Sequence, residues 1–222
     1  MGAPIVLPRI SDMSRRILRV YRSATPAQVE TGLNWYPAAR DIAGDIAHDA
    51  RIPLETAAGI LAALSPQTSW GQNVDWAREL AAGSPISRGL PMSQARGMAI
   101  LAQDREPLEI LGGIKVRAFY ACIVTAGATN AVCVDRHAYD IATGLRGSHV
   151  SLSTKRSEHC ARAYQCAAAR LRSTGEAPGI TAAQLQAVTW VTWRARYWQA
   201  GAWDGYREDP NRAPVTIESE VF

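Results

Sequence analysis

The sequence lacks the patterns that mark membrane-spanning, secreted or disordered proteins. No apolar run approaches the roughly 18 residues that a membrane-spanning helix needs. No N-terminal apolar segment precedes a small-residue cleavage site. The chain of 222 residues is 47% hydrophobic and 20% charged, which is too apolar for intrinsic disorder. We therefore expect a globular, cytoplasmic protein with no membrane partner.

Cysteine and histidine are also scarce, with four residues of each. No two cysteines have the two-residue gap typical of zinc or iron–sulfur ligands. Cys122 and Cys166 lie among apolar and alanine-rich neighbours, where a free thiol acts as a small hydrophobe. One set of polar residues does fall on a single helix face, which fits either a metal site or a solvated acidic face: Asp41, Asp45, His48 and Asp49. We favour the acidic face, and expect no metal and no cofactor.

Strand signals are few, and helix signals cover most of the chain. Residues 131–134 are the only candidate strand, and they fit a loop as well. Pro26 and Pro37 each follow a helix-start signal, and Ser93 is a candidate cap. The expected helices cover 12–22, a segment from 26, 37–51, 54–64, 70–82, 93–103, 118–124, 135–143, 154–172 and 181–199. We expect Gly144 to end the helix over 135–143, and Ser153 or Thr154 to cap the helix over 154–172. This pattern predicts an all-α fold.

The most informative part of the sequence is a double-glycine turn followed at a fixed distance by a carboxylate. The turn lies within Leu111–Arg117, and Val134–His137 then places an aspartate beside an arginine and a histidine. Glycine takes positive φ without a steric penalty and lets backbone N–H groups approach a ligand closely. Because such a turn opening a helix favours phosphate binding, it predicts a nucleic-acid backbone contact with chemistry beside it.

Three segments, taken in order, resemble the helix-hairpin-helix DNA glycosylase superfamily, and the endonuclease III-like group in particular. Leu64–Gln67 follows a buried helix as the family's Leu-Ser-Ala-Gln-like segment does. Leu111–Arg117 is similar to the family's Leu-Pro-Gly-Val-Gly-Arg-Lys hairpin, and Val134–His137 to its Val-Asp-Thr-His segment. The 18 residues from Arg117 to Asp135 equal the family's lysine-to-aspartate interval.

This resemblance covers residues 38–200 and implies two helical lobes with a cleft between them. The lobes would comprise residues 54–144 and residues 1–53 plus 145–203, in one domain ending in a polar tail over 204–222. The resemblance further implies a monomer that binds double-stranded DNA and flips a nucleotide out of the stack.

Asp135 is the candidate catalytic carboxylate. Cleavage of an N-glycosidic bond builds positive charge on the sugar, and a nearby carboxylate stabilises that charge and orients water. The alternative is that Asp135 only caps the following helix. His137 could orient a phosphate or the carboxylate, or could pack as a core histidine.

The resemblance also implies a set of residues that contact DNA. Gln67 matches the residue that probes the gap left by a flipped base, and Trp70 could stack on a base. The alternatives are a backbone-bonding amide and a core tryptophan. The full set of expected contacts is Gln67, Trp70, Asn73, Gly112, Gly113, Lys115, Arg117 and Arg136.

Three departures from the family pattern limit the chemistry. Arg117 stands where bifunctional members carry lysine, and a guanidinium cannot form a Schiff base because that needs a neutral amine. It can instead bind phosphate bidentately. Lys115, in place of the hairpin's second glycine, is a candidate to grip the backbone or to reach the pocket as a catalytic residue. The family's terminal cysteine cluster is absent, so no iron–sulfur cluster is expected.

The leading expectation is therefore a monofunctional N-glycosylase without lyase activity. One alternative is a phage-type transferase that adds an amino acid or amine to an activated hydroxymethyl-pyrimidine in DNA. There Lys115 and Arg117 would suit a pyrophosphate leaving group. Another is a non-catalytic DNA-binding module. The net charge of +4 permits a polyanionic partner without requiring one.

Overall fold

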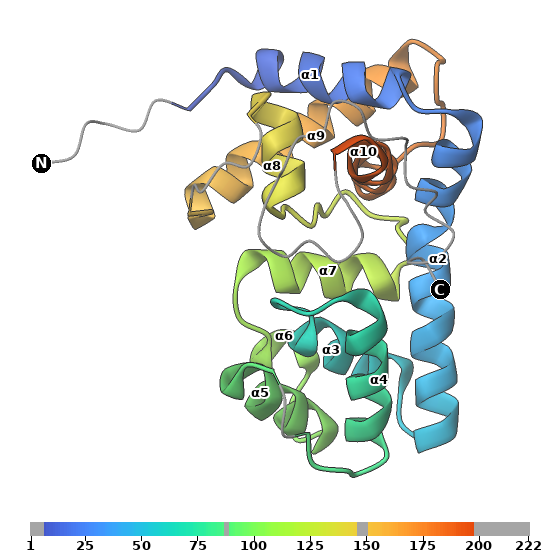
Figure 1. The fold of residues 1–222 in the computed structure, drawn as a ribbon, viewed down its shortest axis with the longest axis vertical. Helices are drawn as coiled ribbons and strands as arrows, with labels where there is room; N and C mark the ends of the chain where they lie inside the picture. Colours follow the sequence, from blue (N-terminus) through green and yellow to red (C-terminus); the bar gives the residue numbers. More distant parts are fainter. Residues whose placement is uncertain (1–6, 87–88, 146–150, 198–222) are drawn as a thin grey trace, which may run out of the picture. The chain divides into compact units, whose positions relative to one another are not determined.

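The computed structural model describes residues 7–86, 89–145 and 151–197. Within these ranges the chain is helical, with ten helices and no strand (Figure 1). The helices are α1 (Ile10–Arg22), α2 (Pro26–Ala50), α3 (Leu54–Leu64), α4 (Trp70–Ala81), α5 (Pro91–Leu101), α6 (Pro107–Ile110), α7 (Ile114–Val124), α8 (Arg136–Thr143), α9 (Thr154–Ser173) and α10 (Ala182–Tyr197). The all-α prediction is confirmed, and residues 131–134 are a loop. The tail expected over 204–222 lies outside the described residues.

The helices form two compact units. The first combines residues up to Gly32 with those from Val134 onward, and the second runs from Leu33 to Cys133. The boundaries therefore fall inside α2 and just before α8, whereas the lobes expected from the sequence change over after residue 53 and after residue 144. The physical reason is that α8 packs against α1, α9 and α10, which draws it into the first unit.

The first unit is built around α10, which contacts α1, α8 and α9. Nearly all of α10 between Ala182 and Trp193 is buried. α1 runs along α9 (Figure 1) and buries Met13, Ile17 and Leu18. The packing of these elements fixes the start of α8, where the candidate carboxylate lies.

The second unit is built around α3, which contacts α4, α5, α6 and α7. Every residue from Thr56 to Leu64 is buried, as expected of an alanine-rich segment that is apolar on nearly all sides. The helix begins after Pro53 and ends at Ser65. The position of α3 at the centre of this unit determines where the 65–69 loop and the α6–α7 turn are held.

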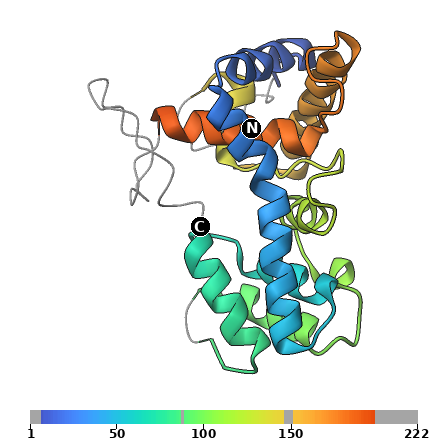
Figure 2. The same cartoon turned by 90° about the vertical axis from the view of Figure 1, so that its right-hand side faces the viewer.

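One expected helix start is wrong, because α2 is continuous through Pro37 (Figure 2). An internal proline lacks the N–H that would bond the carbonyl four residues earlier, and this normally breaks a helix. Here Tyr36, Ala39 and Ala43 are all buried at helical spacing across the proline. Burial of that apolar face therefore outweighs the lost hydrogen bond.

The predicted cap at Ser93 is also wrong. α5 begins at Pro91 with Leu90 in the N-cap position, since proline's fixed φ and missing N–H suit the first helical residue. Ser93 is instead inside the first turn and is 6% exposed. Other predicted boundaries hold more closely, including the cap of α9 by Ser153 and the end of α8 at Gly144.

The close approach of α2 to α10 at Gly32 generates a stability prediction. A Cβ at Gly32 would lie 2.4 Å from the Cα of Val188, whereas a Cβ at Gly44 in the same helix would meet nothing within 4 Å. We expect Gly32→Ala to lower the free energy of unfolding by about 1–3 kcal/mol through overpacking. Gly44→Ala is the matched control and should raise it by roughly 0.5–1 kcal/mol through helix propensity. Urea unfolding of both variants checks this, and equal effects would contradict the packing at Gly32.

Candidate functional site

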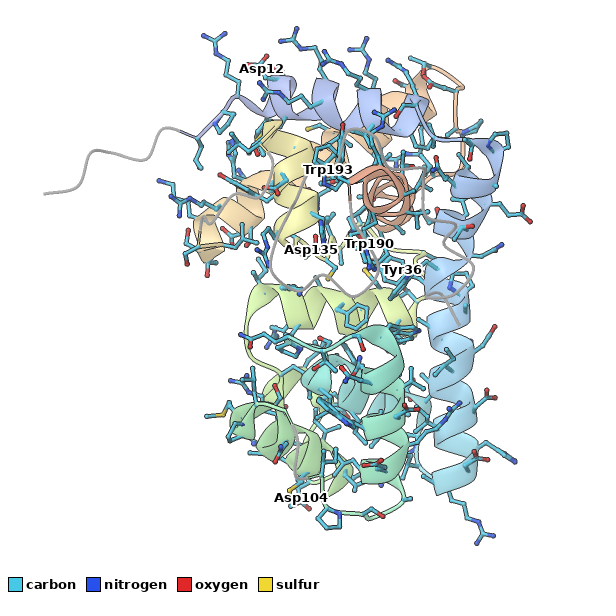
Figure 3. The ribbon with its side chains drawn as sticks, viewed as in Figure 1. Asp12, Tyr36, Asp104, Asp135, Trp190 and Trp193 are labelled. Carbon is cyan, nitrogen blue, oxygen red and sulfur yellow. The ribbon has the colours of Figure 1, made fainter. Side chains whose placement is uncertain are left out.

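The carboxylate of Asp135 is held by two hydrogen bonds at the start of α8. The backbone N–H of Ala138 donates to Oδ1 (2.7 Å), which makes Asp135 the N-cap of α8. The indole N–H of Trp190 on α10 donates to Oδ2 (2.9 Å). Figure 3 shows the two side chains together. Each oxygen of a carboxylate has about two acceptor directions, so two donors leave acceptor capacity on this half-buried group.

The start of α8 is itself anchored to α9. The carbonyl of Ala138 accepts the hydroxyl of Tyr164 (3.3 Å), and the thiol of Cys160 lies 3.7 Å from the same oxygen. Burial raises the pKa of the Cys160 thiol, and the charge of Asp135 raises it further. Cys160 is therefore a neutral packing residue that orients α8, not a nucleophile.

His137 lies beside this carboxylate and is partly buried. Its ring meets that of Trp190 edge-on, with centroids 6.3 Å apart. Burial lowers the pKa of His137, and the positive charges of Arg194 and Arg136 act in the same direction, whereas Asp135 and Asp140 oppose them. A neutral imidazole is favoured at neutral pH, so His137 is placed to hydrogen-bond and not to supply a fixed positive charge.

Trp190 and Arg194 are site residues that the sequence analysis missed. The guanidinium of Arg194 lies 4.5 Å from the centre of the Trp190 ring, a cation–π contact between residues at i and i+4 on α10. That spacing was visible in the sequence. The contact of Trp190 with Asp135 was not, because 55 residues separate them and no local pattern connects them.

The double-glycine turn, termed the hairpin segment, lies in the second unit between α6 and α7. Gly113 has φ of 78° and ψ of 138° and forms the N-cap of α7 without a side-chain cap. The left-handed φ favours glycine, and the open N-terminus leaves backbone N–H groups without helical partners. A Cβ at Gly112 would lie 2.5 Å from Nη2 of Arg96, so the guanidinium of Arg96 rests against the turn.

The two basic residues of the hairpin differ in their surroundings. Nη1 of Arg117 donates to the carbonyls of Leu108 (2.6 Å) and Leu111 (3.3 Å), which closes the turn before α7. Lys115 is exposed on the first turn of α7. Arg117 therefore has a structural role in addition to any phosphate contact, while Lys115 is open to a ligand.

The segment after α3 presents an exposed amide. Gln67 is exposed and has φ of 60°, a left-handed conformation that costs a non-glycine residue about 1 kcal/mol. Trp70 begins α4 after the Ser69 cap and is half-exposed. The expectation of a DNA contact for Asn73 is not supported, since Asn73 is 2% exposed and its Nδ2 donates to the carbonyl of Leu61 (3.1 Å), which ties α4 to α3.

Trp70 belongs to an aromatic cluster that the sequence analysis did not assemble. Its ring lies 5.2 Å from that of Trp35 and 6.2 Å from that of Phe119, and Trp35 lies 5.9 Å from Phe119. Phe119 is buried, whereas both tryptophans are half-exposed. The cluster thus combines the two alternatives for Trp70, a packed residue and an available aromatic surface.

The remaining sequence expectations concern metals, thiols and membranes. In the part of the chain that the structure describes, no three metal-ligating side chains gather in one place, and the four polar residues of α2 named above are all exposed. Cys122 is buried as expected, but Cys166 is exposed, because it lies on the outer side of α9. Arg136, an expected DNA contact, is exposed on α8.

No described helix has the length and apolar character of a membrane span.

Comparison with known proteins gives one family. The model of a family of unknown function, DUF7178, matches residues 8–197. No curated protein and no solved structure matches the chain.

Because Trp190 donates a hydrogen bond to Asp135, we expect substitutions at these two residues to have non-additive effects on the free energy of unfolding. A hydrogen bond to a charged group contributes about 1.5–3 kcal/mol, so Trp190→Phe should lower the free energy of unfolding by an amount in that range. A double-mutant cycle with Asp135→Ala isolates the contact from the loss of the cap. We expect a coupling energy of about 1–2 kcal/mol. Strictly additive effects would show that the hydrogen bond contributes nothing.

Because burial lowers the pKa of His137, we expect the free energy of unfolding to depend on pH. The folded pKa of His137 lies below the unfolded value of about 6.5, so between these values the unfolded chain binds more protons. Stability should rise with pH through that window and be lost as pH falls through it. Urea unfolding at about pH 5 and about pH 7.5 should show a smaller difference for His137→Gln than for the unmodified protein. An unchanged difference would contradict the burial of His137.

Proposed function

We propose that this chain, which belongs to the DUF7178 family, is a DNA-binding enzyme that flips out a nucleotide and cleaves its N-glycosidic bond. It would act as a monofunctional glycosylase on a helix-hairpin-helix glycosylase-like scaffold, with Asp135 as the catalytic carboxylate. The observation that carries the proposal is the fixed carboxylate of Asp135, held by Ala138 and Trp190 at a half-buried helix start.

The chemistry follows from charge and orientation. As the base departs, positive charge develops on the sugar, and a fixed carboxylate stabilises that charge more than a mobile one, because little reorganisation is needed. Two hydrogen bonds hold both oxygens of Asp135. The remaining acceptor directions can face the sugar or orient the attacking water. Capping and catalysis are therefore compatible roles for the same side chain.

Contacts to the DNA are proposed for the second unit. The open turn of Gly112 and Gly113, with Arg96 against it and Lys115 exposed beside it, suits a phosphate group. Gln67 is exposed on a strained turn, as a residue that enters the base stack would need to be. The half-exposed Trp70 offers an aromatic face for a base.

The absence of lyase activity follows from the amines that the chain offers. A guanidinium is not the neutral amine that a Schiff base needs, and that of Arg117 is bonded to two carbonyls. The sequence contains only two lysines, Lys115 and Lys155. We assign Lys115 to the DNA backbone, where its charge is useful, and not to Schiff-base formation, which requires a neutral amine.

A second candidate is the base-modifying transferase. The observation that favours it is the gathering of cations at the hairpin, where Arg96 contacts Gly112 and Lys115 is exposed. Paired cations neutralise the charge of a departing pyrophosphate. In that reaction the glycosidic bond stays intact, so the two candidates differ in whether a free base is released.

The test is incubation of the protein with duplex DNAs that carry uracil, hydroxymethyluracil, alkylated or oxidised bases. Mass spectrometry of the free bases and of the DNA measures the reaction. We expect release of one base class, reduced by about 10²–10³-fold in Asp135→Asn, as for loss of one electrostatic stabiliser. Asparagine caps helices as well as aspartate does, so its Oδ1 can keep the bond from Ala138 while the bond from Trp190 is lost. This variant should therefore stay folded and bind DNA.

Two controls separate the alternatives. Borohydride should trap no covalent protein–DNA product, and Lys115→Ala should weaken binding without changing that result. Base release that persists in Asp135→Asn would contradict the catalytic assignment. Intact DNA throughout, with binding preserved, would overturn the glycosylase in favour of the transferase or of a non-catalytic module.

A further inference from the structure

The outer face of α1 carries only polar side chains, and most of them are arginines. The exposed residues of this helix are Ser11, Arg15, Arg19 and Arg22. The arginines fall at i, i+4 and i+7, which places them on one face over about 10 Å of helix axis. Nitrogen-tipped side chains project from this side of α1, away from Trp193 (Figure 3). The face lies apart from the Asp135 site, and nothing in the proposed reaction uses it.

The three arginines line an open hollow. Together with Ser23 they border a shallow depression that is open to solvent along α1. The opposite side of the helix is anchored, since Ser14 donates to the carbonyl of Ala163 (2.8 Å) on α9. The guanidinium groups are therefore presented by a helix whose position is fixed by packing.

These guanidinium groups keep donors for a ligand. The guanidinium of Arg19 has no hydrogen-bond or ion-pair partner among the described residues. Arg22 uses Nε and Nη2 on Glu176 (3.0 and 2.9 Å), and its Nη1 makes no such bond within the described part of the chain. Arg15 pairs with Asp12 through Nη2 alone.

The two ion pairs do not prevent an anion from binding. Side-chain exposure is 71% for Arg15 and 49% for Arg22, and exposed pairs contribute only about 0–1 kcal/mol. An incoming phosphate can therefore displace or join either carboxylate at little cost. Arg19 and Arg22 lie in the last turn of α1, where positive side chains stabilise the partial negative charge of the helix end. Arg15 lies outside the last turn, so this effect does not account for it.

We propose that Arg15, Arg19 and Arg22 form a second contact surface for the phosphate backbone of the DNA on which the enzyme acts. The inference rests on the proposed function for its partner, but not on Asp135. Guanidinium forks match phosphate oxygens in bidentate geometry. The exposed positions of α1 include no apolar side chain, whereas protein interfaces have aromatic or apolar centres and membrane-bound helices bury an apolar face. A contact with the phosphate backbone of DNA needs no apolar side chain.

The experiment measures binding of a duplex of about 30 base pairs by fluorescence anisotropy over a salt series. The slope of log K against log salt is negative, and each lost phosphate contact makes it less steep by about 0.9. Replacing all three arginines by glutamine should therefore reduce the slope by about 2.7. The double variant Arg15→Gln/Arg19→Gln leaves the Arg22–Glu176 pair intact and should reduce it by about 1.8.

A matched control removes the same charge from other exposed sites. The triple variant of Arg51, Arg78 and Arg105 to glutamine also loses three positive charges, all from exposed positions of the second unit. We expect its slope to stay within about 0.5 of the unmodified protein. Equal changes in both triple variants, or no change in the α1 variants, would overturn the proposal and leave the face to another kind of partner.

The outcomes separate this inference from the proposed function. Single-turnover base release with DNA fully bound should be unchanged in the α1 variants, because Asp135 is untouched. If the unmodified protein binds DNA and releases a base while the α1 variants bind as it does, only the α1 surface is wrong. If the unmodified protein binds no DNA at low salt, the proposed function fails and the α1 surface fails with it.

Discussion

The hydrogen bonds that hold the carboxylate of Asp135 are the constraint on which the first unit depends. A charged group that is half withdrawn from water must be paired, and here the two donors come from two different helices. Ala138 supplies the cap of α8, and Trp190 supplies a side chain from α10. The same contacts that satisfy the charge therefore join α8 to the central helix of the unit. The same two hydrogen bonds stabilise the fold and hold the carboxylate for the proposed chemistry.

In the second unit, exposed polar groups are carried by the turns around a central helix that is mostly apolar. α3 is buried along nearly its whole length and so leaves its polar functions to the segments around it. Gln67 and Gly113 both take left-handed backbone conformations in exposed turns, which a rigid core can impose on loops. The scaffold residues thus lie in buried helices, and these two proposed DNA-contact residues lie in exposed turns.

Local chemistry explains which parts of this molecule could be predicted. The apolar segment of α3, the cap of α8 by Asp135 and the glycine that opens α7 are each specified by a few neighbouring residues. The local signal at Pro37 predicts a helix start that does not occur, because burial of apolar residues on both sides of it stabilises the continuous helix. The contact of Trp190 with Asp135, and the change of unit inside α2, depend on packing between distant segments. No pattern within one window of sequence carries that information.

Asp135 is proposed to stabilise positive charge on a sugar in addition to capping a helix. The most direct measurement compares the affinity for a duplex carrying a cationic aza-sugar with that for a duplex carrying a neutral abasic tetrahydrofuran. The cationic sugar mimics the transition state, and such mimics bind at least about 10²-fold more tightly than ground-state ligands. We predict a preference of about that size in the unmodified protein and its loss in Asp135→Asn. Equal affinities, or a preference that survives the substitution, would contradict the account.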